Sequence, residues 1–148
     1  MTVEVVRASL SDKAVLRRLL QLYHYDFSEL TGEDLDEHGE FAHHYLDHYW
    51  TDPASHPLLI RHEGRLAGFA LVRTEPVNDI AEFFVIRKYR RAGVGREAAR
   101  RVFAMFPGAW QVRQLHDNDA ATAFWRAVAP AGYEETVTAE YRVQHFTT

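Results

Sequence analysis

Two glycines between an apolar segment and an amphipathic one constrain this chain more than any other feature. Residues 80–86 are β-branched and aromatic, which predicts a buried strand. After the glycines, apolar residues recur at helical spacing up to Pro107-Gly108, which predicts a helix over residues 96–106. Gly93 and Gly95 therefore lie where a strand leads into a helix.

Glycine at such a junction allows a positive φ and leaves no Cβ between the backbone amides and a ligand. The first N–H groups of a helix have no intrahelical partner, and the helix dipole makes that end positive. The flanking sequence is basic, with Glu97 as its only acid among Arg87, Lys88, Arg90, Arg91, Arg96, Arg100 and Arg101. The segment therefore predicts a site for a phosphate-rich ligand.

Two common nucleotide motifs fit this segment poorly. A P-loop needs Lys-Ser or Lys-Thr after the second glycine, and here Arg96-Glu97 follows. A dinucleotide fingerprint is nearer, because residues 93–98 fit G-x-G-x-x-A and Asp117 lies downstream. However, residues 87–92 separate the glycines from the strand, and the motif lies past the middle of the chain after a hairpin.

The remaining patterns predict elements along the whole chain. Strands are expected at residues 3–7, 57–61, 66–73, 80–86, 110–115, 133–137 and 140–146, and helices at about 13–30, 41–50, 96–106 and 120–128. Ser9 or Ser11 caps the first helix, and residues 62–65 form a hairpin turn. The order is β-α-α-β-β-β-α-β-α-β-β, which predicts a mixed α/β (α+β) layered fold.

Composition favours a single cytoplasmic domain spanning residues 1–148. Hydrophobic residues make up 47% of the chain, which suffices for a core, and no run is long enough to cross a membrane. No signal-peptide pattern is present, and the absence of cysteine excludes disulfides and thiolate chemistry.

Several motifs resemble those of the GCN5-related N-acetyltransferase (GNAT) family. Arg90-x-x-Gly93-x-Gly95 is similar to its R/Q-x-x-G-x-G/A signature, and Asn118-x-x-Ala121-x-x-Phe124-Trp125 is similar to the segment on its last helix. Gly64 to Gly68 resembles its usual hairpin. The resemblance implies a GNAT-like mixed, mostly antiparallel central sheet of six to seven strands with four helices.

The resemblance also implies an acetyl-CoA-dependent N-acetyltransferase that acts on a primary amine by direct attack on the thioester. A gap is expected between the strands at 80–86 and 110–115, where backbone groups near Phe83 and Val85 pair with the pantetheine arm. The implied residues that bind acetyl-CoA (coenzyme A) as co-substrate are Phe83, Phe84, Val85, Arg90, Arg91, Ala92, Gly93, Val94, Gly95, Arg96, Asn118, Phe124 and Trp125.

The catalytic groups are less completely specified. Glu82 and Asp79 are the candidate general bases, because burial on an apolar strand raises a carboxyl pKa toward the operating range. Trp125 stands where many family members carry the tyrosine that protonates the departing thiolate. Tyr133 or a water molecule is expected to replace that tyrosine as the general acid. The alternative is that the chain is a non-catalytic module that binds or senses CoA. A CoA ester other than acetyl-CoA is a further alternative.

The acceptor side is expected in residues 26–52, which hold nine acids and no Lys or Arg. The electrostatic field of these acids and cation–π contacts with several nearby tyrosines favour a cationic amine, which belongs to a small molecule or a peptide. The alternative is an ordinary solvated acidic surface. The sequence leaves open whether the chain forms a homodimer.

Metal and nucleic-acid functions are not expected. His44 and His48 lie four residues apart, with His43 and Asp47 between or beside them, but no HExxH motif is present. No interleaved base-stacking platform is evident in the basic run, and the chain carries a net charge of −4.

Overall fold

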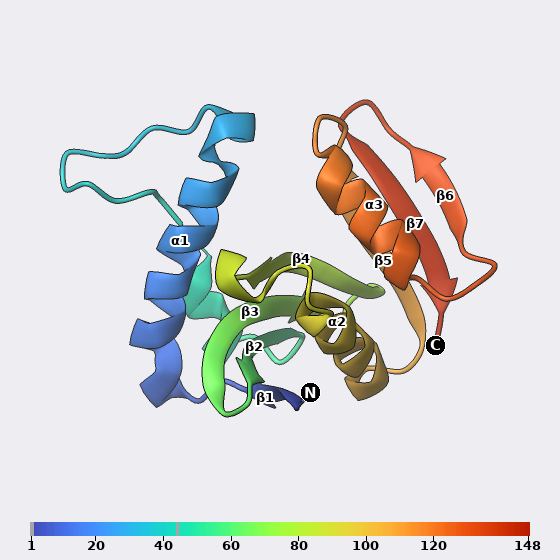
Figure 1. Ribbon diagram of the computed structural model, residues 1–148, viewed down its shortest axis with the longest axis horizontal. Coiled ribbons are helices and arrows are strands. Elements are labelled where there is room, and N and C mark those ends of the chain that lie inside the picture. The colour runs from blue at the N-terminus through green and yellow to red at the C-terminus, as the bar shows by residue number, and fades with distance from the viewer. Residues whose placement is uncertain (1, 44) are drawn as a thin grey trace.

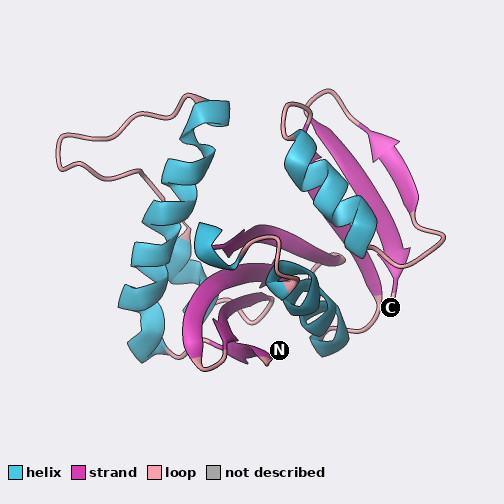
Figure 2. Ribbon diagram, viewed as in Figure 1, coloured by secondary structure: helices cyan, strands magenta, loops and turns pink. Residues whose placement is uncertain are grey.

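The computed structural model describes residues 2–43 and 45–148, and over these residues seven strands form one open sheet (Figures 1 and 2). The strands are β1 (Val3–Arg7), β2 (Ser55–His62), β3 (Arg65–Arg73), β4 (Asn78–Val85), β5 (Ala109–Leu115), β6 (Glu134–Val137) and β7 (Tyr141–Thr147). The α-helices are α1 (Lys13–Thr31), α2 (Val94–Met105) and α3 (Asp119–Val128). Short 3₁₀ turns are η1 (Leu10–Asp12), η2 (Leu46–Trp50) and η3 (Arg87–Tyr89).

The spatial order of the strands is β1-β2-β3-β4-β5-β7-β6. Every neighbouring pair is antiparallel except β4 and β5, which are parallel. This confirms the mixed, mostly antiparallel sheet expected from the sequence. None of the helices in the described residues has the length and apolar character needed to cross a membrane.

Both faces of the sheet are covered, which explains why β2 and β3 have unbroken apolar runs at residues 57–60 and 66–72. In β2, Leu59 packs in the cluster that includes Leu16 and Leu20 of α1. Its neighbours Leu58 and Ile60 point to the opposite face, where α2 lies. Successive side chains of a strand alternate between faces, so a strand covered on both sides must be apolar at each position.

Local signals placed most element ends correctly. The β2–β3 hairpin turns through Glu63 and Gly64, whose φ values of 50° and 77° suit a two-residue turn of the primed type. Helix α1 ends at Gly32 in the left-handed conformation. Before α1, the Asp12 carboxylate accepts from the Ser9 N–H at 2.9 Å, so the expected capping pattern forms at the start of η1, the 3₁₀ turn that leads into α1.

The helix predicted over residues 41–50 is wrong in extent, so the described chain has three α-helices rather than four. Only the 3₁₀ turn at Leu46–Trp50 forms. The side chain of Gln21 bonds both the N–H and the carbonyl of Phe41, each at 2.8 Å, and so occupies the carbonyl that a helix beginning at Phe41 would need. The Phe41 side chain is buried there, which offsets the loss of helical bonding.

Gly68 of β3 sets the spacing between β3 and β4, and Gly68→Ala should destabilise the fold. A Cβ at Gly68 would lie 1.9 Å from the Phe84 carbonyl oxygen, so β4 must move. We expect a loss of about 2–3 kcal/mol in the free energy of unfolding, measured by urea denaturation. The control is Gly64→Ala, whose Cβ meets open space at a positive φ and should cost about 1 kcal/mol. Equal losses in the two variants would contradict this account of Gly68.

Candidate active site

Strands β4 and β5 pair over only a short length and then diverge. Their parallel pairing joins only Asn78 to Trp110 and Asp79 to Gln111. On its other side, β4 has a bulge at Ala81, because Leu71 pairs with Glu82 while Val72 pairs with Ile80. A bulge bends its strand and strengthens the local twist, and so turns the rest of β4 away from β5.

A cleft of about 1150 Å³ occupies the space between the separated strands. One wall is formed by α1, the floor by β4, and the other wall by β5 and α3, in agreement with the arrangement seen in Figure 1. The edge of β4 that faces β5 beyond Asp79 is unpaired among the described residues. Apart from the Val85 carbonyl, which accepts from Nε of Arg90, its backbone N–H and C=O groups are therefore available to an extended ligand.

The glycine turn lies at one end of this cleft. Gly93 has a φ of 83°, and Arg91 is also left-handed, with a φ of 63°. The first bond of α2 runs from the N–H of Glu97 to the carbonyl of Gly93 at 3.1 Å, so the amides of Val94, Gly95 and Arg96 precede it. Together with the helix dipole, these amides form an anion site.

Gly95 has a role different from that of Gly93. It lies inside α2 with ordinary helical geometry, and a Cβ there would lie 3.2 Å from the Phe124 ring of α3. The sequence indicated that both glycines permit a turn. The structure shows that only Gly93 does so, whereas Gly95 allows α2 and α3 to approach closely.

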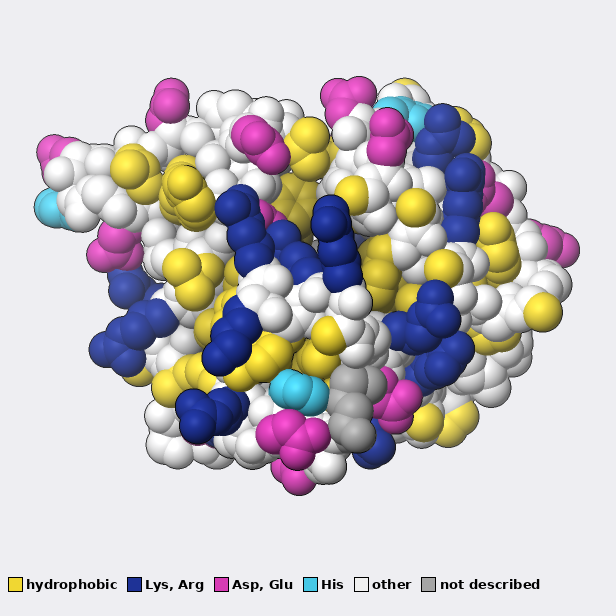
Figure 3. All heavy atoms as spheres, viewed as in Figure 1, with side chains coloured by type: hydrophobic (Ala, Val, Ile, Leu, Met, Phe, Trp, Pro, Cys, Tyr) yellow, Lys and Arg dark blue, Asp and Glu magenta, His cyan; other side chains and the backbone are white. Residues whose placement is uncertain are grey.

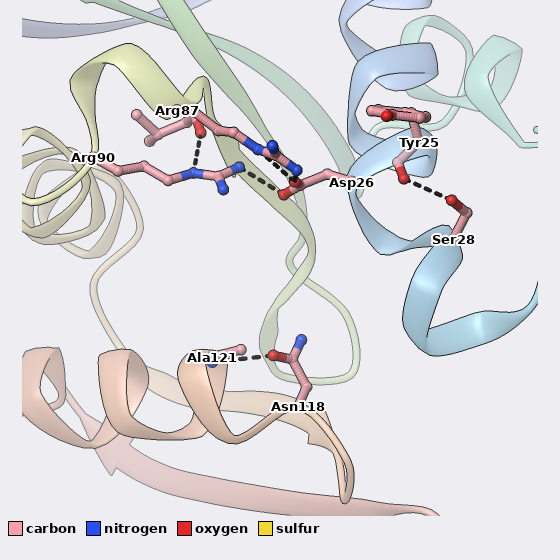
Figure 4. Close-up of polar contacts among 8 residues, drawn as sticks. Tyr25, Asp26, Ser28, Arg87, Arg90, Asn118 and Ala121 are labelled. Atoms are coloured by element: carbon pink, nitrogen blue, oxygen red, sulfur yellow. Dashed lines mark hydrogen bonds and ion pairs between the residues drawn. The ribbon is translucent and has the colours of Figure 1, made fainter.

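Basic side chains surround the mouth of the cleft. Figure 3 shows Lys and Arg side chains gathered at the centre of the face that carries it, and Arg90, Arg91 and Arg96 are among its lining residues. Arg87 and Arg90 both bind Asp26 of α1, with Nη2 to carboxylate distances of 2.8 and 2.7 Å (Figure 4). Burial would raise the pKa of Asp26, but the hydrogen bonds from Arg90 and Arg87 outweigh it and lower that pKa.

Glu82 is a carboxylate that β4 presents to the cleft. Burial raises its pKa, while a hydrogen bond from the Tyr23 hydroxyl and the charge of Arg113 oppose the shift. Burial, followed by the charge of Glu82, raises the pKa of Tyr23 well above its ordinary value and that of Tyr49 to about 12. Both tyrosines therefore stay protonated at neutral pH, and the pKa of Glu82, the carboxylate whose charge affects both of them, is raised.

Asp79, the other candidate base, has a different environment. It lies where β4 and β5 pair, is 8% exposed, and is not among the residues that line the cleft. Its carboxylate accepts a hydrogen bond from Arg113 at 2.9 Å. Burial raises its pKa and Arg113 opposes the shift. Asp79 thus links β4 to β5 at the point where they separate.

Helix α3 supplies the opposite wall. The Asn118 side chain caps it by accepting from the Ala121 N–H at 3.2 Å (Figure 4). Phe124 faces Phe83 of β4, with ring centroids 5.8 Å apart. Trp125 is 7% exposed and packs edge-on against Phe83 at 5.1 Å. Trp125 is thus mainly a core residue, with one surface toward the cleft.

These features agree with a comparison to protein-family models. A model described as the acetyltransferase (GNAT) family matches residues 16–129. The chain belongs to the GNAT family of acetyltransferases. A comparison with curated proteins found no match.

Solved acetyltransferase structures share the fold. An acetyltransferase from Thermus thermophilus superposes with a TM-score of 0.76 at 15% identity, over 100% of this chain and 98% of that chain. The ribosomal-protein-S18-alanine N-acetyltransferase of Escherichia coli gives 0.69 at 12%, over 99% and 94%. The PaiA N-acetyltransferase of Thermoplasma acidophilum, solved in complex with coenzyme A, gives 0.69 at 9%, over 100% of both chains.

Most residues that the GNAT resemblance implied for the cofactor line this one cleft. Ala92 and Val94 are the exceptions, since Ala92 is exposed and Val94 is fully buried beneath the turn. Tyr133, the suggested substitute acid, is not a lining residue, whereas Tyr23 and Tyr141 are. Sequence reasoning missed the roles of Tyr23 and Asp26 because helical spacing alone does not show which strand or loop a helix will face.

The acidic segment is only partly directed into the cleft. Asp26 and Glu33 line it, but Glu40 pairs with Arg17 and Asp47 pairs with Lys13, both on α1. Among the described residues, no group of three His, Cys, Asp or Glu side chains is placed to hold a metal ion. His44, one half of the histidine pair considered above, lies outside the described residues.

Glu82→Gln should stabilise the GNAT fold at neutral pH. Because burial holds the pKa of Glu82 above its ordinary value of 4.5, the folded chain binds that proton more tightly than the unfolded chain. Stability is therefore lost as the pH rises through the folded pKa, and glutamine avoids that loss. Urea denaturation should show the variant more stable at about pH 7.5 and the difference shrinking toward about pH 4. A wild type that is more stable at neutral pH would mean that Tyr23 and Arg113 outweigh burial.

Proposed function

We propose that this protein is an acetyl-CoA-dependent N-acetyltransferase that acetylates a primary amine of a small molecule or a peptide. The observation that carries the proposal is the unpaired edge of β4, which opens onto a cleft that ends at the glycine turn. The pantetheine arm of acetyl-CoA pairs with this edge, and its diphosphate binds the amides at the start of α2. A backbone N–H of β4 polarises the thioester carbonyl.

In this reaction the amine nitrogen attacks the thioester carbon, a C–N bond forms, and the C–S bond breaks. The amine gives up a proton, and the departing thiolate takes one. Glu82 accepts the amine proton directly or through water, because its carboxylate lines the cleft and its pKa is raised by burial. A cationic acceptor is favoured by the carboxylates of Glu33 and Glu82 in the same cleft.

A second candidate function is a non-catalytic module that binds CoA. It is favoured by Trp125, which stands where many family members have a tyrosine and which here packs into the core. Thiol release with a panel of amines separates the two functions. Tight CoA binding without release for any amine supports the module, and release with any amine supports the enzyme.

Gly93→Val should weaken CoA binding by roughly tenfold or more, measured by calorimetry. A β-branched residue is disfavoured at the φ of 83°, so the turn must rearrange and its amides lose their convergence. The matched control is Gly132→Val, because Gly132 has a φ of 87° in open space between α3 and β6. Wild-type affinity in Gly93→Val would rule out this turn as the diphosphate site.

Glu82→Gln should lower kcat/KM for the best amine by roughly 10²-fold or more while leaving CoA affinity unchanged. Wild-type activity should rise with pH through the Glu82 pKa, because the base acts as a carboxylate, and this acid limb should vanish in the variant. Thiol release across the pH range measures both effects. Full activity in the variant would exclude Glu82 as the base.

A further inference from the structure

Asp26 is the point at which α1 contacts the basic mouth of the cleft. Its Oδ1 accepts from Nε and Nη2 of Arg87, at 3.2 and 2.8 Å, and its Oδ2 accepts from Nη2 of Arg90 at 2.7 Å. Figure 4 shows the carboxylate reaching from the helix to both guanidinium groups. Both carboxylate oxygens are therefore occupied by arginines that flank the glycine turn.

Arg90 is held from a second side. Its Nε donates to the carbonyl of Val85 at 2.8 Å, at the last residue of β4. Its guanidinium also lies 5.5 Å from the centroid of the Phe84 ring. Arg90 is thus fixed among a strand end, an aromatic ring and a helix, although it lies at the surface.

This arrangement suits preorganised anion binding. A free arginine side chain carries about 2 kcal/mol of rotamer entropy, part of which is lost when it binds a phosphate. Two arginines and one carboxylate leave the cluster with a net positive charge. The side chain of Arg87 is still 71% exposed, so its remaining N–H groups are accessible from solvent, and Arg90 is the one of the two that lines the cleft.

We propose that Asp26 is a positioning residue for the diphosphate of the co-substrate, holding Arg87 and Arg90 beside the turn at Gly93. This inference rests on the proposed function, because it assumes that CoA occupies the cleft. Asp26 acts through the two arginines and makes no contact with the ligand itself.

The same helix also reaches the reacting end of the cleft. Tyr23 lies three residues before Asp26, one turn earlier on the same side of α1, and hydrogen-bonds to Glu82. Helix α1 therefore contacts the two arginines through Asp26 and contacts the proposed base through Tyr23, one turn earlier.

The experiment compares binding of CoA with binding of pantetheine, which lacks the diphosphate, in the full-length wild type and in Asp26→Asn. Calorimetry measures CoA, and an NMR titration at millimolar concentration measures pantetheine. We expect Asp26→Asn to weaken CoA binding by roughly tenfold and to leave pantetheine binding within about twofold of wild type.

The matched control is Glu135→Gln. It breaks an Arg126 pair with similar distances of 2.8 and 2.7 Å and similar exposure of the acid, away from the glycine turn. This control should leave the affinities for both ligands unchanged.

Three results would overturn the inference. Unchanged CoA affinity in Asp26→Asn would remove the positioning role, and tighter CoA binding would show that Asp26 competes with the diphosphate. Equal weakening of both ligands, with a lower unfolding midpoint, would show a purely structural role. A wild type that binds neither ligand would overturn the proposed function itself.

Discussion

The separation of β4 from β5 is the constraint on which the rest of the structure depends. Two paired positions hold the strands together at one end, and the bulge at Ala81 turns β4 away beyond them. Backbone bonds do not hold the two halves of the sheet together past that point. Aromatic packing does so instead, through Phe83 of β4 against Phe124 and Trp125 of α3. An edge that a folded sheet would normally pair is thus left unpaired beyond Asp79 among the described residues.

This aromatic packing gives a physical reason for the tryptophan at position 125. At a position where many relatives have a tyrosine, this chain has a larger apolar ring that contacts Phe83 and Phe103 in the core. The indole adds to the packing between β4 and α3, and in the proposed acetyl transfer it offers no acid for the leaving thiolate. The tyrosines that line the cleft, Tyr23 and Tyr141, come from α1 and β7, on walls that face each other.

Charge is separated along the cleft, and α1 contacts both ends. At the mouth, arginines surround the turn at Gly93, and Asp26 partly neutralises them. Deeper in, Glu82 is half-buried beside Tyr23, and its carboxyl holds its proton more strongly than an exposed one. In the proposed function, an anionic co-substrate and a basic acceptor are thus favoured at different places in one cavity, which suits the transfer of a group from one to the other.

The sequence by itself determined the strands, the helices around the glycine motif, the hairpin at Glu63-Gly64 and the turn at Gly93, because each depends on residues near one another in the chain. It was wrong about a helix at residues 41–50, because Gln21, 20 residues away, bonds the backbone of Phe41. Only the tertiary structure decided which carboxylate is buried in the cleft, which one links β4 to β5, and that Asp26 binds an arginine 64 residues away. Burial and ion pairing join residues that are remote in sequence, and no local pattern encodes which of them will meet.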